Sequence, residues 1–273
     1  MSCVWINGDL VPEASARVSP FDHGLLTGDG VFETLLARDG TVFAVRRHLE
    51  RLARSAATLG LSLPSADVLR AALNQVIEGN GLTDARLRIT VTGGPAPLGS
   101  DRGAGPTTAI VAAGALTVWP PTTAVVLAPW PRNERSPLAG VKSTSYAENV
   151  VALAWARERD AGEALLANTA GNLCEGTGSN VFVVVDGRLV TPPLSSGCLA
   201  GVVRGLLVEG SLAGEEDIPI SALTDVEEAF LASSTREVQP IDRLDGRALP
   251  PPFRHADDAM HLLQACWKDS PDP

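Results

Sequence analysis

Lysine is rare in this chain, and one of its two lysines lies near the middle. Lys142 occurs in GVKSTSYAENV (residues 140–150), Lys268 lies close to the last residue, and the other basic side chains are arginines. Arginine serves for surface charge and anion binding but stays protonated, whereas a lysine amine can lose its proton and act as nucleophile or base. Lys142 is therefore a candidate catalytic amine. The alternative is a surface lysine without a chemical role.

An acidic residue follows 33 positions later, in CEGTGSNVF (residues 174–182). Glu175 stands there among small residues, directly before an apolar run typical of a strand. Such a carboxylate could hold a protonated ring nitrogen, because an acid beside a base stabilises the charged form of both. The alternative is a turn carboxylate that caps local amides.

Three further stretches offer groups that bind anions. In CLAGVVRG (residues 198–205) a glycine precedes a predicted helix, whose first amides, those of Val202 and Val203, form an anion site. The alternative is a glycine that only forms the turn before the helix and has no role in binding. Ser234 and Thr235 follow an apolar strand and offer hydroxyls. Arg51, in HLERL, could bind an anion or be an ordinary exposed helix arginine.

An amine for a Schiff base, an acid for a ring nitrogen and several phosphate donors are together what pyridoxal 5'-phosphate requires. With these residues the chain resembles the fold-type IV, or class IV aminotransferase-like, pyridoxal-phosphate enzymes. This group includes D-amino-acid aminotransferases, branched-chain aminotransferases and 4-amino-4-deoxychorismate lyases. The resemblance runs from WING (5–8) to LDG (244–246) in the family's order, through DGVFE (29–33), HLERL (48–52), LAGVVR (199–204) and TRE (235–237).

The resemblance implies a role for each candidate. Lys142 would form the Schiff base and Glu175 would pair with the pyridine nitrogen. Phosphate would be bound by Arg51, the amides of Val202 and Val203, and Ser234 or Thr235. Tyr146, the only tyrosine, would lie near the phenolic oxygen of the cofactor; the alternative is a tyrosine on a buried helix face. The family's fold is two α/β (α+β) domains with the cofactor in the cleft between them, and its members are commonly homodimers.

The pattern of the chain predicts the elements that carry these residues. We expect an Asn-Gly hairpin near residues 4–11, a second hairpin with strands 31–36 and 42–45, and helices over 46–59 and 66–77, the latter capped by Ser65. Strands are predicted over 87–92, 107–113, 124–127, 164–166, 180–185, 188–191, 229–231 and near Ile218, and helices over 146–159, after Gly201 and over 256–267. Residues 269–273 are predicted to be disordered. The WPP sequence at 119–121 suggests domains at 1–117 and 124–273, joined by a linker at 118–123.

Composition excludes several classes of function. A net charge of −10 argues against nucleic acid as a partner, because phosphate binding needs a basic surface. The first residues show no signal peptide and no apolar run reaches membrane-spanning length, so we expect a cytoplasmic protein that is not bound to a membrane. The four cysteines show no paired spacing, so neither a disulfide framework nor a metal site is implied.

Two residues, Thr34 and Arg102, help to predict which of the family's reactions this chain catalyses. Thr34 matches a threonine that deoxychorismate lyases carry in their pocket, whereas the Tyr-x-Arg pattern of branched-chain enzymes is not evident near residues 86–92. Arg102 is the nearest candidate for a substrate carboxylate, or else a solvated loop residue. One flexible arginine suits one carboxylate better than the two of the lyase substrate. We therefore predict transamination between a D-amino acid and a 2-keto acid. The lyase is the alternative, followed by branched-chain or amine transaminases.

Overall fold

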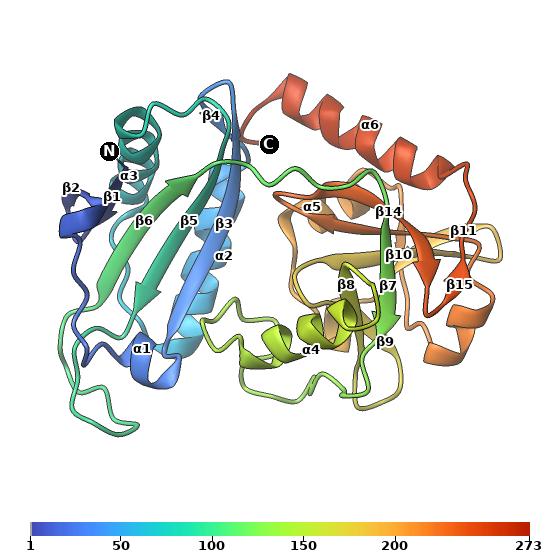
Figure 1. The fold of residues 1–273 in the computed structure, drawn as a ribbon, viewed down its shortest axis with the longest axis horizontal. Coiled ribbons are helices and arrows are strands. Elements are labelled where there is room, and N and C mark those ends of the chain that lie inside the picture. The colour runs from blue at the N-terminus through green and yellow to red at the C-terminus, as the bar shows by residue number, and fades with distance from the viewer. Residues whose placement is uncertain (1) are drawn as a thin grey trace. The chain divides into compact units, whose positions relative to one another are not determined.

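The computed structural model describes residues 2–273, and this chain divides into two compact units (Figure 1). The main segment of unit 1 ends at Thr117, and unit 1 also contains Val141–Tyr146 and Ser270–Pro273. Unit 2 consists of Val118–Gly140 and Ala147–Asp269. Each unit combines a β-sheet with helices, which confirms the predicted mixed α/β class. Within residues 2–273 no helix is long and apolar enough to cross a membrane.

Unit 1 is built on a six-stranded sheet in the order β2-β1-β6-β5-β3-β4, with antiparallel neighbours throughout. Its strands are β1 (Cys3–Ile6), β2 (Asp9–Pro12), β3 (Gly30–Arg38), β4 (Thr41–Val42), β5 (Ala85–Thr92) and β6 (Thr108–Gly114). Asn7 and Gly8 join β1 to β2 with φ values of 51° and 114°, as a tight Asn-Gly hairpin requires.

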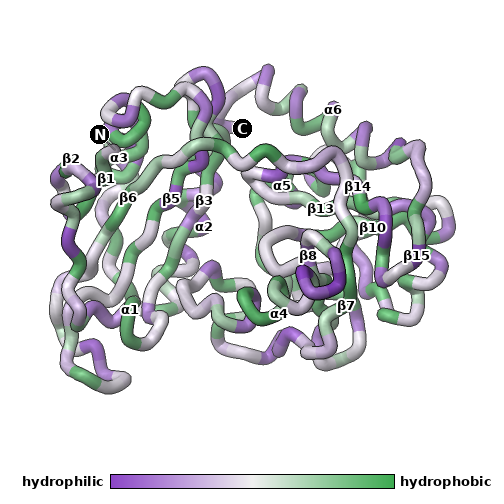
Figure 2. Tube along the Cα trace, viewed as in Figure 1, coloured by the Kyte–Doolittle hydropathy of each residue, from purple (hydrophilic) through white to green (hydrophobic). Residues whose placement is uncertain are grey.

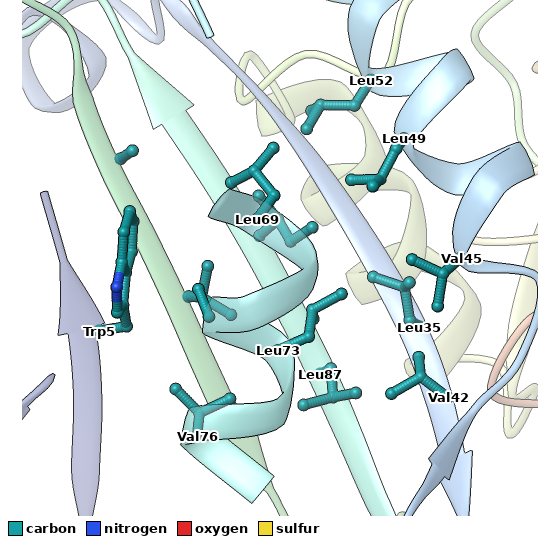
Figure 3. Packing of buried hydrophobic residues seen from close by; sticks show 14 of the residues in the cluster. Trp5, Leu35, Val42, Val45, Leu49, Leu52, Leu69, Leu73, Val76 and Leu87 are labelled. Carbon is teal, nitrogen blue, oxygen red and sulfur yellow. The ribbon is translucent and has the colours of Figure 1, made fainter. Parts of the chain in front are cut away.

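Two long helices cover one face of this sheet. Unit 1 contains η1 (Glu13–Ser15), α1 (His23–Thr27), α2 (Val45–Leu59) and α3 (Ala66–Gly79). The hydroxyl of Ser65 accepts a hydrogen bond from the amide of Val68 at 3.3 Å, which confirms the predicted cap of α3. Leucines of α2 and α3 pack onto the odd-numbered residues of β3 and β5, such as Leu35 and Leu87 (Figure 3). Because strand side chains alternate, Phe32 and Thr34 project from the opposite face of β3.

Unit 2 holds a nine-stranded sheet, ordered β12-β11-β10-β13-β14-β7-β8-β9 with β15 beside β14. Its strands are β7 (Thr123–Leu127), β8 (Glu163–Ala167), β9 (Leu173–Gly176), β10 (Asn180–Val185), β11 (Arg188–Thr191), β12 (Gly214–Glu215), β13 (Glu228–Ser233), β14 (Glu237–Leu244) and β15 (Arg247–Ala248). Strands β10 and β13 bury apolar side chains on both faces, and the rings of Phe182 and Phe230 stack across the pair with centroids 4.8 Å apart.

The helices of unit 2 are α4 (Ala147–Arg157), α5 (Val202–Glu209) and α6 (Arg254–Asp269), with short 3-10 turns η2 (Leu194–Ser196) and η3 (Ile220–Thr224). Along α6, hydrophilic residues alternate with less polar ones in Figure 2, as expected for a helix that buries one face, here through Ala256, Ala259 and Leu263.

The structure corrects four local predictions. Val45 begins α2 instead of ending a strand, because Ala44 adopts a left-handed conformation (φ 52°) that turns the chain. Ile218 lies in an irregular segment between β12 and η3, not in a strand. Glu175 lies on strand β9. The sequence did not predict this strand, because small residues with little preference for strands surround Glu175.

The fourth correction concerns the end of the chain. Residues 270–273 are ordered against α2: the amide of Arg46 donates to Asp272 Oδ1 at 2.7 Å, and the amide of Ala44 donates to the carbonyl of Pro271 at 2.6 Å. A carboxylate at a helix N-terminus is favourable because the first amides lack partners within the helix.

Candidate active site

Lys142 lies on a segment of unit 1 that extends the edge of β3. The amide of Phe32 donates to the Lys142 carbonyl at 3.0 Å, and the amide of Thr144 donates to the Gly30 carbonyl at 2.8 Å. The Lys142 amide itself donates to the hydroxyl of Ser55 on α2 at 3.2 Å. Backbone pairing fixes the register, and a shift by one residue would turn the lysine side chain to the other side.

The amine of Lys142 lies against a buried aromatic ring. Its Nζ is 4.5 Å from the centroid of Phe32, and the Tyr146 ring meets Phe32 edge-on with centroids 5.3 Å apart. The lysine and the tyrosine therefore share one neighbour on the same sheet face. Tyr146 precedes the first residue of α4, so it is not on the buried face of that helix.

Arg51 is buried on α2, so the exposed-arginine alternative is wrong. Its Nε and Nη2 donate to the two carboxylate oxygens of Glu33 at 2.8 and 2.6 Å, and His48 Nδ1 lies 2.7 Å from Glu33 Oε2. Burial would raise the pKa of Glu33, but the charge and hydrogen bonds of Arg51, together with the hydrogen bond from His48, lower it to about 2. Burial lowers the pKa of His48, so the imidazole is neutral and donates through Nδ1. Phosphate binding by Arg51 stays a prediction.

The face of β3 and β5 that is turned away from α2 and α3 carries two arginines and the predicted threonine. Thr34 pairs with Arg88 in the register of β3 and β5, and Leu36 pairs with Arg86. The Arg88 guanidinium lies 3.8 Å from the Phe32 centroid and donates through Nε to the Thr90 hydroxyl at 3.1 Å. Among residues 2–273, no acidic side chain forms an ion pair with Arg88. Arg88 is not among the site residues predicted from the sequence, because the Tyr-x-Arg pattern of branched-chain enzymes is not evident on this strand.

Arg102 lies in the loop after β5, where its guanidinium binds groups of unit 1. It donates to Asp29 Oδ1 at 2.6 Å and to the carbonyls of Leu59 and Gly60 at 2.7 and 3.1 Å. Asp29 in turn lies 2.8 Å from His23 Nδ1. These contacts attach the loop to the end of α2; a contact of Arg102 with substrate stays a prediction.

Glu175 occupies a defined polar position in unit 2. Its Oε2 accepts a hydrogen bond from the Leu199 amide at 2.9 Å, and Arg132 Nη2 lies 3.6 Å from its Oε1. The side-chain Nδ2 of Asn180 donates to the Leu199 carbonyl at 2.9 Å. A nearby cation favours the ionised carboxylate, which a protonated ring nitrogen would need. Arg132 could not be predicted from the sequence, because a loop arginine 43 positions from Glu175 has no local signal.

The helix end that offers Val202 and Val203 lies next to this position. Gly201 is the N-cap of α5 and gives no side-chain hydrogen bond to the first amides. A Cβ on Gly201 would stand 1.9 Å from the Asn180 amide oxygen, so only glycine lets α5 begin this close to β10. The first amides of α5 thus keep their capacity to bind an anion.

Ser234 and Thr235 form the turn between β13 and β14. Because Asn180 pairs with Ala232 in the register of β10 and β13, this turn follows the strand end beside which α5 begins. The Thr235 carbonyl accepts a hydrogen bond from Trp119 Nε1 at 3.0 Å. Unit 2 thus brings Glu175, the α5 amides and the 234–235 turn to the same strand ends, whereas Lys142, Tyr146, Arg51, Thr34 and Arg102 belong to unit 1.

Comparison with known proteins decides the family. A family model described as amino-transferase class IV matches residues 30–244. The chain belongs to the class IV aminotransferases. This class IV chain is 34% identical to a putative branched-chain-amino-acid aminotransferase of Methanocaldococcus jannaschii, over 90% of this chain and 89% of that protein. It is 30% identical to a D-alanine aminotransferase of Staphylococcus epidermidis, over 90% of each.

Solved structures of class IV enzymes share the fold. A branched-chain aminotransferase of Thermoproteus uzoniensis superposes with a TM-score of 0.90 at 30% identity, covering 96% of this chain and 94% of that one. A putative 4-amino-4-deoxychorismate lyase of Legionella pneumophila gives a TM-score of 0.88 at 25% identity, covering 93% and 96%. The family resemblance and the fold-type IV class are therefore confirmed.

Class IV aminotransferases use pyridoxal 5'-phosphate, and the residues present fit that group. The first amides of α5 and the hydroxyls at 234–235 suit a phosphate, the Glu175 carboxylate suits a ring nitrogen, and the Lys142 side chain is an amine of the kind that forms a Schiff base. The chain is thus a pyridoxal-phosphate enzyme that acts on amino and keto acids.

The role of Glu175 can be tested against a neighbouring acid. Glu175→Gln should lower kcat by about 10²–10³-fold, the usual effect of removing one preorganised electrostatic partner, because a neutral amide does not hold a protonated ring nitrogen. Steady-state kinetics measures this. The matched control is Glu148→Gln, since Glu148 contacts the same Arg132 at 3.4 Å but is exposed. Equal kcat values in the two variants would remove Glu175 from the site.

Proposed function

We propose that this enzyme transfers the amino group between a D-amino acid and a 2-keto acid, and that a dicarboxylic acid such as glutamate is one of its substrates. The observation that carries the proposal is the position of Arg88. Its guanidinium and the Lys142 amine both lie against the Phe32 ring, and Arg88 has no acidic partner in residues 2–273. An arginine fork binds a carboxylate through two parallel hydrogen bonds.

Each residue has a distinct task in this proposal. When bound, pyridoxal phosphate supplies an electron-withdrawing ring that carries the amino group. The Lys142 amine accepts the proton from the substrate Cα and returns it during transfer, while the Phe32 ring excludes water from one side of the amine. Glu175 holds the ring nitrogen, and the amides of Val202 and Val203 with Ser234 or Thr235 hold the phosphate. Arg88 orients the substrate carboxylate.

The choice of substrate class rests on charge and on relatives. Leu36 pairs in register with Arg86, so the face that carries Thr34 also presents a second cation. Two arginines favour a substrate with an acidic side chain over a branched-chain amino acid. An alkyl side chain offers a cation neither an ion pair nor a hydrogen bond that would compensate the cost of desolvation. The similarity to D-alanine aminotransferases supports the D configuration, and a homodimer remains implied only by the family.

Deoxychorismate lyase activity is the second candidate. Thr34 is partly accessible on the same face and pairs with Arg88, and two arginines also suit a substrate with two carboxylates. The lyase-titled structural neighbour supports the same alternative.

A half-reaction distinguishes the candidates. The cofactor-loaded protein is mixed separately with D-alanine, D-glutamate, L-leucine and L-glutamate, without keto acid, and the visible absorbance of the bound cofactor is followed. We expect loss of this absorbance with the two D-amino acids only. Loss with L-leucine would establish branched-chain activity instead. A yellow protein that responds to none of the four would be tested with 4-amino-4-deoxychorismate, and release of pyruvate would then identify a lyase.

The same assay tests Arg88. Arg88→Gln should raise the half-saturating D-glutamate concentration by about 10–100-fold, as expected for loss of a hydrogen bond to a charged group. The control is Arg70→Gln, because Arg70 is a surface helix arginine that pairs with Asp272 at 3.3 Å. Unchanged saturation in Arg88→Gln would refute carboxylate binding by this face.

A further inference from the structure

Unit 2 contains a buried ion pair that the proposed reaction does not use. Arg236 Nη2 donates to Glu163 Oε2 at 2.9 Å, and both side chains are almost fully buried. Glu163 is the first residue of β8, whereas Arg236 follows the 234–235 turn. A buried pair of this kind is a weak source of stability, because desolvation of the two charges offsets most of their attraction. We therefore look for a role of this pair in the geometry that it imposes on its surroundings.

On one side, the pair fixes the turn that carries Ser234 and Thr235. Arg236 Nη1 donates to Gln239 Oε1 at 2.8 Å, and the guanidinium lies 4.2 Å from the centroid of a Trp119 ring. The same tryptophan donates to the Thr235 carbonyl. The residue directly after the turn is thus held from two directions, and the turn has little freedom to move.

On the other side, Glu163 holds the turn between β9 and β10. Its Oε1 accepts hydrogen bonds from the amide of Thr177, at 3.0 Å, and from the Thr177 hydroxyl, and its Oε2 lies 3.4 Å from the Ser179 hydroxyl. A Cβ on Gly176 would stand 2.7 Å from Ser179 Oγ, so this turn is also tightly packed. Gly176 immediately follows Glu175 in the chain.

The contacts continue to Glu175 itself. Asn149, buried on α4, donates to the Thr177 carbonyl at 2.5 Å and accepts from Arg132 Nη2 at 3.2 Å. Arg132 in turn lies 3.6 Å from Glu175. A continuous series of polar contacts therefore runs from the 234–235 turn to Glu175, all within unit 2.

We propose that Glu163 and Arg236 are positioning residues that set the phosphate-binding turn, Ser234 and Thr235, at a fixed place relative to the carboxylate of Glu175. The inference rests on the cofactor site proposed above. Pyridoxal phosphate is a rigid ring with its phosphate on a short arm, so both ends bind well only when their partners keep a set separation. Preorganised partners lose less entropy when the cofactor binds, so they bind the cofactor more tightly.

The test measures release of the cofactor from the holoenzyme. Diluted holoenzyme is followed by its visible absorbance in Glu163→Gln and Arg236→Lys, with inorganic phosphate as competitor, well below the unfolding temperature of each variant. Glu163→Gln keeps the size and one acceptor but removes the charge, and lysine cannot reach Glu163 and Gln239 together. We expect cofactor affinity about 10–100-fold weaker in both variants.

The matched control is Glu228→Gln. Glu228 is a buried carboxylate at the opposite end of β13, where it accepts from the Ala256 amide at 2.8 Å and lies 3.1 Å from His255 Nδ1. A purely structural role for Glu163 would lower the unfolding temperatures of Glu163→Gln and Glu228→Gln and leave cofactor release at the wild-type rate in both. That result would overturn the proposal.

Two more variants keep the test decisive. If Glu163→Gln does not fold, Thr177→Val removes one hydroxyl donor and keeps the ion pair, and faster release is again expected. Ser234→Ala with Thr235→Val tests the turn itself. Unchanged release there would show that the phosphate site is assigned wrongly, whereas altered release there with wild-type release in the ion-pair variants would refute only the positioning role. No amino acid substrate is present, so an error in the substrate assignment leaves the test intact.

Discussion

Replacing Lys142 by arginine is expected to abolish transamination while the protein stays folded. Arginine keeps the positive charge and stacks well on an aromatic ring, so the contact with Phe32 is preserved. A guanidinium does not give up its proton near neutral pH, so it can neither bond to the cofactor nor carry a proton from the substrate Cα. Turnover should fall by more than about 10²–10⁴-fold, the contribution of a positioned acid–base group alone.

The chain offers its own control for this variant. Lys268 is the other lysine, and it is exposed on the last turn of α6. Lys268→Arg should retain full turnover and the visible absorbance of the bound cofactor, whereas Lys142→Arg should lose both and keep a wild-type far-UV spectrum. Turnover in Lys142→Arg comparable to that of Lys268→Arg would end the assignment of Lys142.

The largest expected effect on stability is that of Glu33→Gln. Glu33 is completely buried between Arg51 and His48, and its carboxylate compensates the charge of the arginine. A glutamine removes the counter-charge that Glu33 gives to the buried arginine and turns an NH₂ group toward another donor. Breaking a buried pair in this way costs about 3–5 kcal/mol. Urea unfolding at pH 7 measures the loss.

An exposed glutamate on α2, the helix that carries Arg51 and His48, gives the control. Glu50 pairs with Arg46 one turn away at 3.1 Å, and both side chains are about half exposed (50% and 49%). Glu50→Gln should change the free energy of unfolding by less than about 0.5 kcal/mol. If the two variants lose equal stability, the buried pair is not the source of the effect.

The pH dependence of this contribution has a defined sign. The pKa of Glu33 is lowered in the folded protein to about 2, so the unfolded chain binds more protons between this value and the ordinary carboxyl value of about 4. The stability that Glu33 contributes is therefore complete above about pH 5 and declines as the pH falls toward 2. The difference between wild type and Glu33→Gln should shrink over the same range.

Local chemistry made much of the fold predictable. The Asn7-Gly8 turn needs two residues that tolerate positive φ, and Ser65 needs only the amide of Val68, three residues away. Such features depend on a few neighbouring residues, so their signals are readable in the chain. Prediction failed where a distant contact decided the outcome: residues 270–273 are ordered because α2 offers free amides to Asp272, more than 220 positions away in sequence.

The candidate site divides in the same way. The sequence by itself determined which residues are candidates: a rare lysine, an acid among small residues and a glycine before a helix predict an amine, a ring-nitrogen partner and an anion site. Only the tertiary structure decided which groups accompany them. Glu33 compensates Arg51, Arg88 lies against the Phe32 ring, and Glu163 pairs with Arg236 across 73 positions. Burial and charge pairing act through space, and neither residue of such a pair shows by its own type which distant partner the folded chain will bring to it.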